Sequence, residues 1–421
     1  MNTASIVPAG LPALDAASEQ HRLAVEKHLI QRILATDSGF LPFEQWMDLA
    51  LYAPGLGYYA AGSVKFGGDL PIGDFATAPE LTPLFGHVLA NQAAQVLQAC
   101  GSATLLEFGA GSGALAATII PALRRLGIEP EYQILEVSAD LRARQQARLA
   151  PLNAKVKWLS ALPETFSGCV LANEVLDAMP VTLFRWDENG TLMEIGVSLA
   201  GADTARDKAT ADAQESAAAA AAPFKWVERP APSALRQAMT QRMPPLPGYQ
   251  SEINLRAEAW VAQMGLWLRR GAALLIDYGF PQREYYHPQR KEGTLMCHFR
   301  HHAHSQPLIY AGLQDITAHV DFTAMADAAL EGGLDVLGYT SQARFLMNAG
   351  LGEALAASGG MAQQTDADDA KATASRVSNM SAAQKLISEA EMGELFKVLA
   401  IGRGLDQALI GFMRGDRRDR L

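Results

Sequence analysis

The hydrophobic positions along the chain follow two alternating periods. Short apolar runs with the length and composition of buried strands lie at 105–108, 132–135, 156–159, 169–172, 272–278, 334–339 and 396–401. Stretches with helical periodicity or composition lie at 19–36, 114–120, 139–149, 251–269 and 322–330. Strands that alternate with helices are typical of a parallel sheet covered by helices. The pattern therefore predicts an α/β fold with a mostly parallel sheet.

The junction between the first strand of this sheet and its helix carries the strongest local signal. Residues 105–113 are Leu-Leu-Glu-Phe-Gly-Ala-Gly-Ser-Gly, so Glu107 is followed by Gly109, Ala110, Gly111 and Gly113. A strand that turns sharply into a helix, close to a ligand, needs residues without a Cβ atom. We therefore predict a nucleotide-type cofactor loop with a carboxylate at the end of the strand. A purely structural turn is the alternative.

Two cofactors fit this loop. The pattern G-x-G-x-x-G/A of dinucleotide-binding proteins is satisfied with Ala114 in its last position, and the helix N-terminus would then hold a pyrophosphate. S-adenosylmethionine (SAM) has no phosphate, but it carries a sulfonium, an amino group and a carboxylate. Such a cofactor suits an acid just before the glycines and tolerates a third glycine. Glu107 therefore favours SAM over NAD.

The ends of the following strands carry further candidate cofactor ligands. Glu136 ends the second strand, where an acid accepts hydrogen bonds from both ribose hydroxyls of either cofactor; a solvated carboxylate before the next helix is the alternative. Ser160 and Ala161 follow the third strand, where the adenine would lie. Asn173 follows the fourth strand, beside two further acids. Ligands of open parallel sheets bind beyond the carboxyl ends of the strands, so these residues are expected to share one site.

Eight segments in the same order resemble the MidA-type SAM-dependent methyltransferases. This family includes the mitochondrial assembly factor that methylates an arginine of a respiratory complex I subunit. The matching segments are 43–59, 73–80, 107–113, 172–181, 276–279, 293–295, 312–323 and 392–399. The resemblance implies a Rossmann-like class I methyltransferase with seven strands, the last of them antiparallel. It also implies SAM as cofactor, S-adenosyl-L-homocysteine (SAH) as product, and a protein arginine as acceptor, on a respiratory complex subunit or a similar protein.

The expected domain organisation follows from changes in composition along the chain. Residues 39–80 are rich in Gly, Pro and aromatic residues, so 1–84 is expected to form an N-terminal helical cap with cofactor-covering loops. The methyltransferase domain is expected over 85–421, with insertions at about 184–250 and 340–392. A hairpin is predicted within the first insertion, around residues 187–190. Two low-complexity stretches, 200–222 and 356–376, lack periodic apolar residues and are expected to be dispensable insertions. The first of them is expected to be a disordered or loosely helical loop.

Two acids follow the fourth strand at a spacing suited to an arginine substrate. Glu174 and Asp177 could hold one guanidinium through paired, charge-assisted hydrogen bonds. Capping of a following helix by one of them, or contact of Glu174 with SAM, is the alternative. His319, with Asp321 nearby, is a candidate proton acceptor or guanidinium orienter, and a structural histidine is equally compatible with the sequence.

Other features narrow the function further. The cluster Cys297, His298, His301, His302 and His304 has no metal-like spacing, so no metal is expected. The tyrosines between residues 52 and 59 either cover the SAM pocket or pack the N-terminal segment against the core. A net charge of −10 argues against nucleic-acid binding, and no apolar run is long enough to span a membrane.

The expected compartment is a bacterial cytoplasm, because the three cysteines indicate a reducing environment and the N-terminus has no signal-like pattern. An NAD-dependent oxidoreductase, a non-catalytic assembly factor and a small-molecule methyltransferase remain alternative functions. The acceptor, the degree of methylation and the oligomeric state are left open by the sequence.

Overall fold

The computed structural model describes residues 7–61, 77–200, 223–360 and 366–421, with the backbone alone over 358–360 and 366–376. Residues 201–222 of the first predicted low-complexity stretch and residues 361–365 of the second therefore lie outside the described residues. The chain divides into two compact units, and each combines three separate segments. Unit 1 takes in the described residues before 75, with 178–256 and 283–319, and unit 2 takes in 76–177, 257–282 and 320–421.

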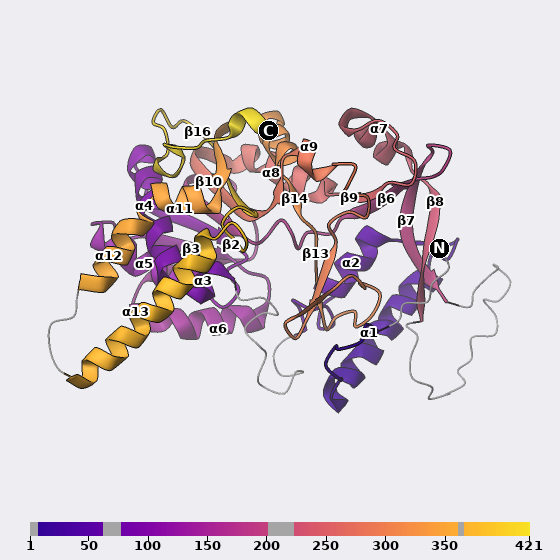
Figure 1. Ribbon diagram of the computed structural model, residues 1–421, viewed down its shortest axis with the longest axis horizontal. Helices are drawn as coiled ribbons and strands as arrows, with labels where there is room; N and C mark the ends of the chain where they lie inside the picture. The colour runs from indigo at the N-terminus through magenta and orange to yellow at the C-terminus, as the bar shows by residue number, and fades with distance from the viewer. Residues whose placement is uncertain (1–6, 62–76, 201–222, 361–365) are drawn as a thin grey trace. The chain divides into compact units, whose positions relative to one another are not determined.

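Unit 2 contains the predicted parallel sheet. Its described strands lie in the order β15 (Asp335–Ser341), β16 (Phe396–Arg403), β10 (Leu268–Phe280), β5 (Phe166–Asn173), β2 (Thr104–Phe108), β3 (Glu131–Leu135) and β4 (Lys155–Leu159). The pairs from β10 to β4 are parallel, whereas β16 runs antiparallel to both β10 and β15. The short strand β14 (Val320–Asp321) adds a parallel pair at the end of β10. The predicted fold class is confirmed, including the antiparallel last strand. Figure 1 labels β16, β10, β2 and β3 of this sheet.

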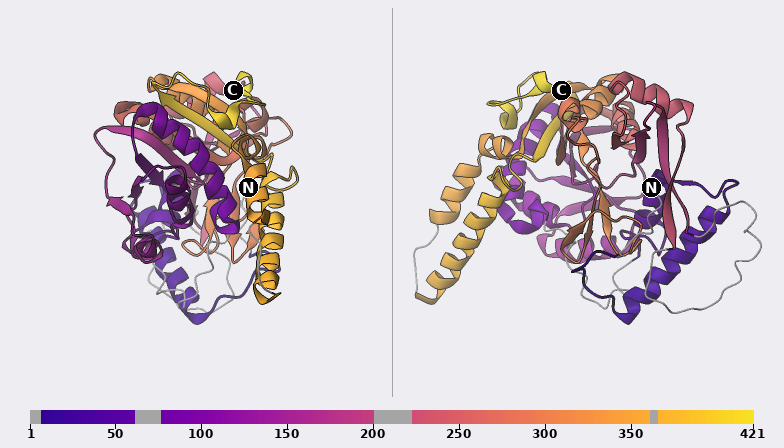
Figure 2. Two further views of the ribbon diagram at one scale, coloured as in Figure 1. Left: turned by 90° about the vertical axis from the view of Figure 1, so that its left-hand side faces the viewer. Right: turned by 45° about the vertical axis from the view of Figure 1, so that its right-hand side comes forward.

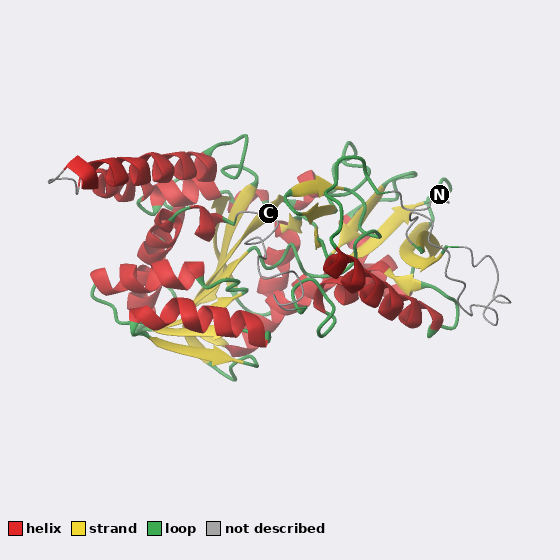
Figure 3. Ribbon diagram, turned by 90° about the horizontal axis from the view of Figure 1, so that it is seen from below, coloured by secondary structure: helices red, strands yellow, loops and turns green. Residues whose placement is uncertain are grey.

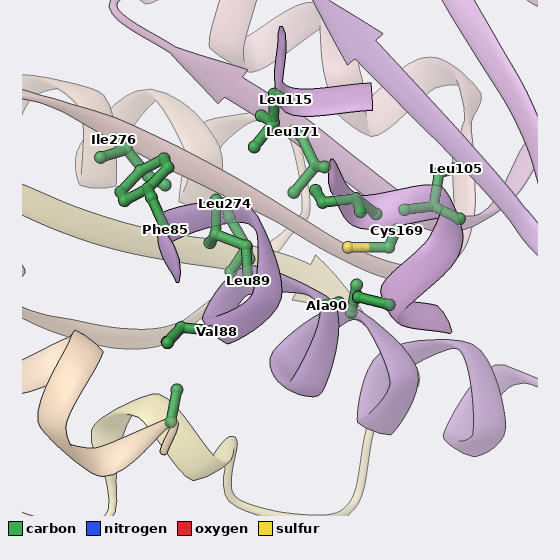
Figure 4. Packing of buried hydrophobic residues seen from close by; sticks show 14 of the residues in the cluster. Phe85, Val88, Leu89, Ala90, Leu105, Leu115, Cys169, Leu171, Leu274 and Ile276 are labelled. Carbon is green, nitrogen blue, oxygen red and sulfur yellow. The ribbon is translucent and has the colours of Figure 1, made fainter. Parts of the chain in front are cut away.

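Helices cover both faces of this sheet because side chains alternate along each strand. On one face, α4 (Pro83–Cys100) and α5 (Ala114–Arg125) pack on inward residues such as Leu105, Leu171 and Leu274. Figure 4 shows Phe85 and Leu89 of α4 among these strand side chains. On the other face, α10 (Phe322–Glu331) contacts β10, β15 and β16, and α8 (Leu255–Trp267) places its aromatic rings against β2 and β5. Figure 3 shows the helices in red and the strands in yellow.

The remaining described helices of unit 2 are short or peripheral. They are α3 (Ala78–Leu81), α6 (Ala139–Leu149), α11 (Gln342–Asn348), α12 (Leu351–Gly360) and α13 (Asp366–Ile387). Figure 2 shows α12 and α13 extending together away from the sheet. No helix in the described part of the chain is long and apolar enough to cross a membrane.

Unit 1 is built around a second, antiparallel sheet. Within the described residues its strands are β1 (Leu41–Pro42), β7 (Leu192–Leu199), β6 (Thr182–Trp186), β9 (Gln250–Ile253) and β8 (Phe224–Pro230), which pairs with β7. The helices α1 (Ala16–Leu34) and α2 (Phe43–Tyr52) pack on it through a core that includes Val25, Leu29, Trp46 and Val197. The helix α7 (Ser233–Arg242) follows β8. The short helix α9 (Gln282–Tyr285) lies at the start of the third segment of unit 1. A smaller sheet contains β12 (His302–His304), β11 (Met296–Phe299) and β13 (Asp315–Thr317).

Some of the elements predicted from the sequence agree with the structure and others do not. The hairpin around 187–190 is confirmed as the antiparallel pair β6–β7. The helix predicted over 251–269 is wrong at both ends, because residues 250–253 pair with β6 and residues from Leu268 onward belong to β10. The segment expected as an insertion at 184–250 belongs to unit 1 together with the N-terminal helices, whereas 340–392 contributes α11, α12 and α13 to unit 2.

Candidate active site

The glycine loop connects β2 to α5 in unit 2. Gly109, Gly111 and Gly113 all have positive φ, at 64°, 50° and 82°, which side chains with a Cβ atom rarely adopt. A Cβ on Gly109 would lie 2.7 Å from Cγ2 of Val175, whereas a Cβ on Gly111 would have no protein atom within 4 Å. Gly109 is therefore needed for packing, and Gly111 borders open space. The loop meets the backbone requirement of the predicted cofactor site.

Glu107 lies on β2 with its side chain on the same face as Leu105, and it is buried. Its Oε2 accepts a hydrogen bond of 2.8 Å from the hydroxyl of Tyr132 on β3. Burial raises the pKa of Glu107 to about 7, and the hydrogen bond from Tyr132 offsets part of that rise. The carboxyl group thus lies near the glycine loop at a pKa where it can hold or release a proton near neutrality.

Glu136 follows β3 and is also buried. Its Oε1 accepts a 2.8 Å hydrogen bond from the backbone N–H of Ser138, and its Oε2 accepts one of 3.0 Å from Nε2 of Gln145. Ser160 and Ala161 follow β4 directly and are exposed. Because β2, β3 and β4 are parallel neighbours, these residues lie at one edge of the sheet with the glycine loop. Their contacts with a cofactor stay predictions.

A polar cluster contacts the glycine loop at Ser112. The Ser112 hydroxyl donates to Glu80 of α3, and Arg148 of α6 hydrogen-bonds to both Glu80 and Ser112. Burial opposes the ionisation of Glu80, but the hydrogen bonds from Arg148 and Ser112 outweigh it and lower the pKa of this carboxyl group. Glu80 belongs to the segment 73–80 that carried the resemblance, although its contact with the loop had no signal in the sequence.

The acids expected to bind substrate lie where β5 ends. Nδ2 of Asn173 donates a 2.9 Å hydrogen bond to Oε1 of Glu174, and Glu174 has a positive φ of 54°. Left-handed backbone at a residue with a Cβ atom costs about 1–2 kcal/mol and is found more often at functional sites than elsewhere. Asp177 is buried and accepts a 2.5 Å hydrogen bond from the hydroxyl of Tyr278. Residues 174–181 contain no helix, so the capping alternative for these acids is wrong.

Asp277 is the residue at this edge to which the sequence assigned no role. It lies on β10, is buried, and its Oδ2 accepts hydrogen bonds from the backbone N–H groups of Leu176 and Asp177 at 3.0 and 3.2 Å. Burial, with the nearby Asp177 and Glu174, raises the pKa of Asp277 well above its usual range. The motif Ile276–Gly279 pointed to this segment, but only the pairing of β5 with β10 shows that Asp277 fixes the turn that bears both acids.

His319 and Asp321 lie in different compact units. His319 belongs to unit 1, where its backbone N–H donates a 2.9 Å hydrogen bond to Oγ1 of Thr294. Asp321 belongs to unit 2 and caps α10, since its Oδ1 accepts from the N–H of Ala324 at 3.2 Å. A structural role therefore accounts for Asp321, and a catalytic role for His319 stays a prediction.

Two other sequence features form local structure in unit 1. Cys297 and His304 lie opposite each other in the β11–β12 hairpin, whose turn contains Arg300 and His301 in left-handed conformations. Among the described residues, no three His, Cys, Asp or Glu side chains are grouped to hold a metal ion. Tyr52 and Tyr59 stack at 5.5 Å, and the Tyr59 hydroxyl lies 2.8 and 2.9 Å from the two Asp315 oxygens. These contacts agree with aromatic packing, and a role in covering a cofactor stays a prediction.

Comparisons with known proteins bear on this site. A family model for S-adenosyl-L-methionine-dependent methyltransferases matches residues 88–340, more than half of the chain. A solved structure from Burkholderia thailandensis bound to S-adenosyl-homocysteine is 43% identical, with a TM-score of 0.84, over 98% of this chain and 100% of that one.

Two curated relatives extend the comparison. The protein arginine methyltransferase NDUFAF7 homolog, mitochondrial, of Drosophila melanogaster is 28% identical over 80% of this chain and 78% of the relative. The human protein arginine methyltransferase NDUFAF7, mitochondrial, is 26% identical over 77% of this chain and 73% of the relative. Of the two cofactors that fit the glycine pattern, these matches support SAM.

Proposed function

The chain belongs to the family of S-adenosyl-L-methionine-dependent methyltransferases, and from that premise we propose that its acceptor is an arginine of a protein substrate. The observation that carries the proposal is the acid cluster beside the glycine loop. Val175, between the two acids, lies against Gly109, so the acids and the loop adjoin within unit 2. The names of the curated relatives support the same acceptor.

The acids suit a guanidinium better than a neutral acceptor. A guanidinium is a planar cation with five N–H donors, and carboxylates bind it through paired, charge-assisted hydrogen bonds. Glu174 and Asp177 supply two carboxyl groups on one turn, and Asp277 holds that turn through two backbone N–H groups. In this proposal Glu174 and Asp177 hold the guanidinium and favour localisation of its charge away from the reacting nitrogen.

The residues around the loop fit the cofactor of the family. Glu136 would accept hydrogen bonds from the ribose hydroxyls, and the backbone at Gly111, which borders open space, would allow close approach of the cofactor. When bound, SAM supplies an already activated methyl group. The protein's task is then to orient the acceptor nitrogen and to receive its proton. We propose a carboxylate of the acid pair as the proton acceptor.

The acid pair is tested by conservative substitutions. Glu174→Gln and Asp177→Asn keep the shape of each side chain and remove its charge, so each should lose a charge-assisted hydrogen bond worth about 1.5–3 kcal/mol. Methyl transfer to arginine should fall by about one to two orders of magnitude for each variant. SAH affinity, measured by titration calorimetry, should change little, because in this proposal both acids contact the acceptor and neither contacts the cofactor.

A matched control is Asp416→Asn, which alters a carboxylate that accepts the backbone N–H of Tyr339 elsewhere in unit 2. Transfer is followed with methyl-labelled SAM and proteins from a strain that lacks this chain, and the product is identified as methylarginine by mass spectrometry. Wild-type rates in the Glu174→Gln, Asp177→Asn double variant would refute the paired-acid mechanism. Label in small molecules alone would refute the protein acceptor, and SAH binding without any transfer would favour an assembly factor.

A further inference from the structure

Gln145 on α6 is a fully buried polar side chain whose hydrogen bonds meet three separate segments of unit 2. Its Nε2 donates to the backbone oxygen of Gly111 at 2.9 Å and to Oε2 of Glu136 at 3.0 Å. Its Oε1 accepts a 2.9 Å hydrogen bond from the indole N–H of Trp158. These partners lie in the glycine loop, at the end of β3 and on β4, two residues before Ser160.

The amide group matches this set of partners in a way that other side chains do not. An amide has two N–H donors on one atom and an acceptor on the other, and here both donors and the acceptor are used. Glutamate would replace the two donors with an acceptor facing Glu136 and a carbonyl oxygen. Leucine would leave both of those acceptors, and the Trp158 donor, without this partner.

The neighbouring contacts show that the arrangement is tightly packed. A Cβ on Gly113 would lie 3.5 Å from Cγ of Gln145, so the side chain also lies against the last glycine of the loop. The second oxygen of Glu136 is held by the N–H of Ser138 at 2.8 Å. The direction of the Glu136 carboxylate is therefore set from both of its oxygens, and Gln145 sets one of them.

We propose that Gln145 is the positioning residue of the cofactor site, which holds the Gly111 peptide, the Glu136 carboxylate and the β4 edge in their binding geometry before SAM arrives. The inference rests on the cofactor of the family and on the predicted roles of Gly111 and Glu136. It does not depend on the arginine acceptor, so a chain that binds SAH through this arrangement and methylates another substrate would leave it intact. A site arranged in advance spares the ligand the entropic cost of ordering the loop.

Titration calorimetry with SAH tests the proposal directly. Gln145→Leu should raise the Kd for SAH at least tenfold, because one hydrogen bond to a carboxylate and one to the loop are lost. Gln145→Glu, which preserves the shape, should be impaired at least as strongly. Trp158→Phe, which removes a single donor to Oε1, should weaken binding less than either. Binding by Gln145→Leu should also show a less favourable entropy, since the loop must then be ordered on binding.

The matched control is Gln92→Leu on α4 in the same unit. Gln92 is also fully buried, and its amide accepts from the N–H of Gly411 and donates to Gln95, both at 2.9 Å. This variant should lower the melting temperature and leave the Kd for SAH within about twofold of wild type. Amide hydrogen exchange in the peptide spanning 109–113 should accelerate in Gln145→Leu and not in Gln92→Leu.

Two outcomes would overturn the proposal. One is an unchanged Kd for SAH in a folded Gln145→Leu or Gln145→Glu protein. The other is an equal loss of SAH affinity in the Gln145 and Gln92 variants, because the effect would then follow overall stability. If Gln145→Leu does not fold, the comparison of Gln145→Glu and Trp158→Phe with wild type decides the question by the same criteria.

Discussion

Glu107 makes the stability of unit 2 depend on pH in a predictable direction. Burial raises the pKa of this carboxyl group from its ordinary value of 4.5 to about 7. The folded chain therefore retains a proton that the unfolded chain releases. This tighter proton binding by the folded chain stabilises it against unfolding. The stabilisation is fully present below about pH 4.5, and it is lost as the pH rises through about 7, where Glu107 ionises in the folded chain as well.

The size of the effect follows from the same pKa. A change from 4.5 to about 7 corresponds to about 3 kcal/mol of unfolding free energy in total, of which about 2 kcal/mol falls between about pH 5.5 and 8.5. Glu107→Gln is neutral throughout and keeps an acceptor for the Tyr132 hydroxyl. Its buried amide N–H adds a cost of about 1–3 kcal/mol, but that cost does not vary with pH. The stability of the variant relative to wild type should therefore improve by about 2 kcal/mol across this range.

Urea unfolding followed by tryptophan fluorescence at several pH values measures this difference. Tyr132→Phe removes the hydrogen bond that lowers the pKa of Glu107, so the loss of stability should continue to a higher pH than in wild type. Gln92→Leu serves as a control that reduces stability without altering the pH profile. Parallel profiles for wild type and Glu107→Gln would refute the reasoning, because they would show that the buried carboxyl group does not bind its proton more tightly in the folded state.

Two further predictions concern the glycine loop and the turn that bears the acids. Gly111→Ala should fold with a loss of about 1–2 kcal/mol of stability, because of its positive φ, and should bind SAH at least tenfold more weakly by calorimetry. The control is Gly101→Ala, which also has positive φ and no atom near its Cβ; it should lose similar stability and leave the affinity for SAH unchanged. Equal SAH affinities for the two variants would contradict the assignment of the loop. Asp277→Ala should reduce methyl transfer to arginine by at least tenfold with little change in SAH affinity. Asp277→Asn keeps an oxygen that accepts from the N–H groups of Leu176 and Asp177, so it should recover most of the rate. Equal rates for these two variants would contradict the positioning role of Asp277.

The parallel sheet was predictable from sequence because its strands are short, mostly apolar runs that alternate with helical stretches. The same pattern predicts Glu107, Glu136 and Glu174 as candidate site residues, since each lies at or near the end of such a run. Gln145 gave no signal, because a glutamine on the polar helix α6 looks solvated until the loop and β3 are placed beside it. Likewise the sequence predicts a helix from residue 251, because only the pairing of β9 with β6 identifies residues 250–253 as a strand.

The division of unit 1 into three separate segments has a consequence for how the protein folds during synthesis. The hydrogen bond between Tyr59 and Asp315 joins residues 256 positions apart, and β1 pairs with β7 from the second segment. At about 5–20 residues per second, a ribosome needs on the order of 10 to 50 s to proceed from the first segment of this unit to the end of its third. During that interval, the apolar faces of α1 and α2, with Leu29 and Trp46, lack their partners. The nascent N-terminal segment therefore exposes apolar surface until the later segments of unit 1 have been made.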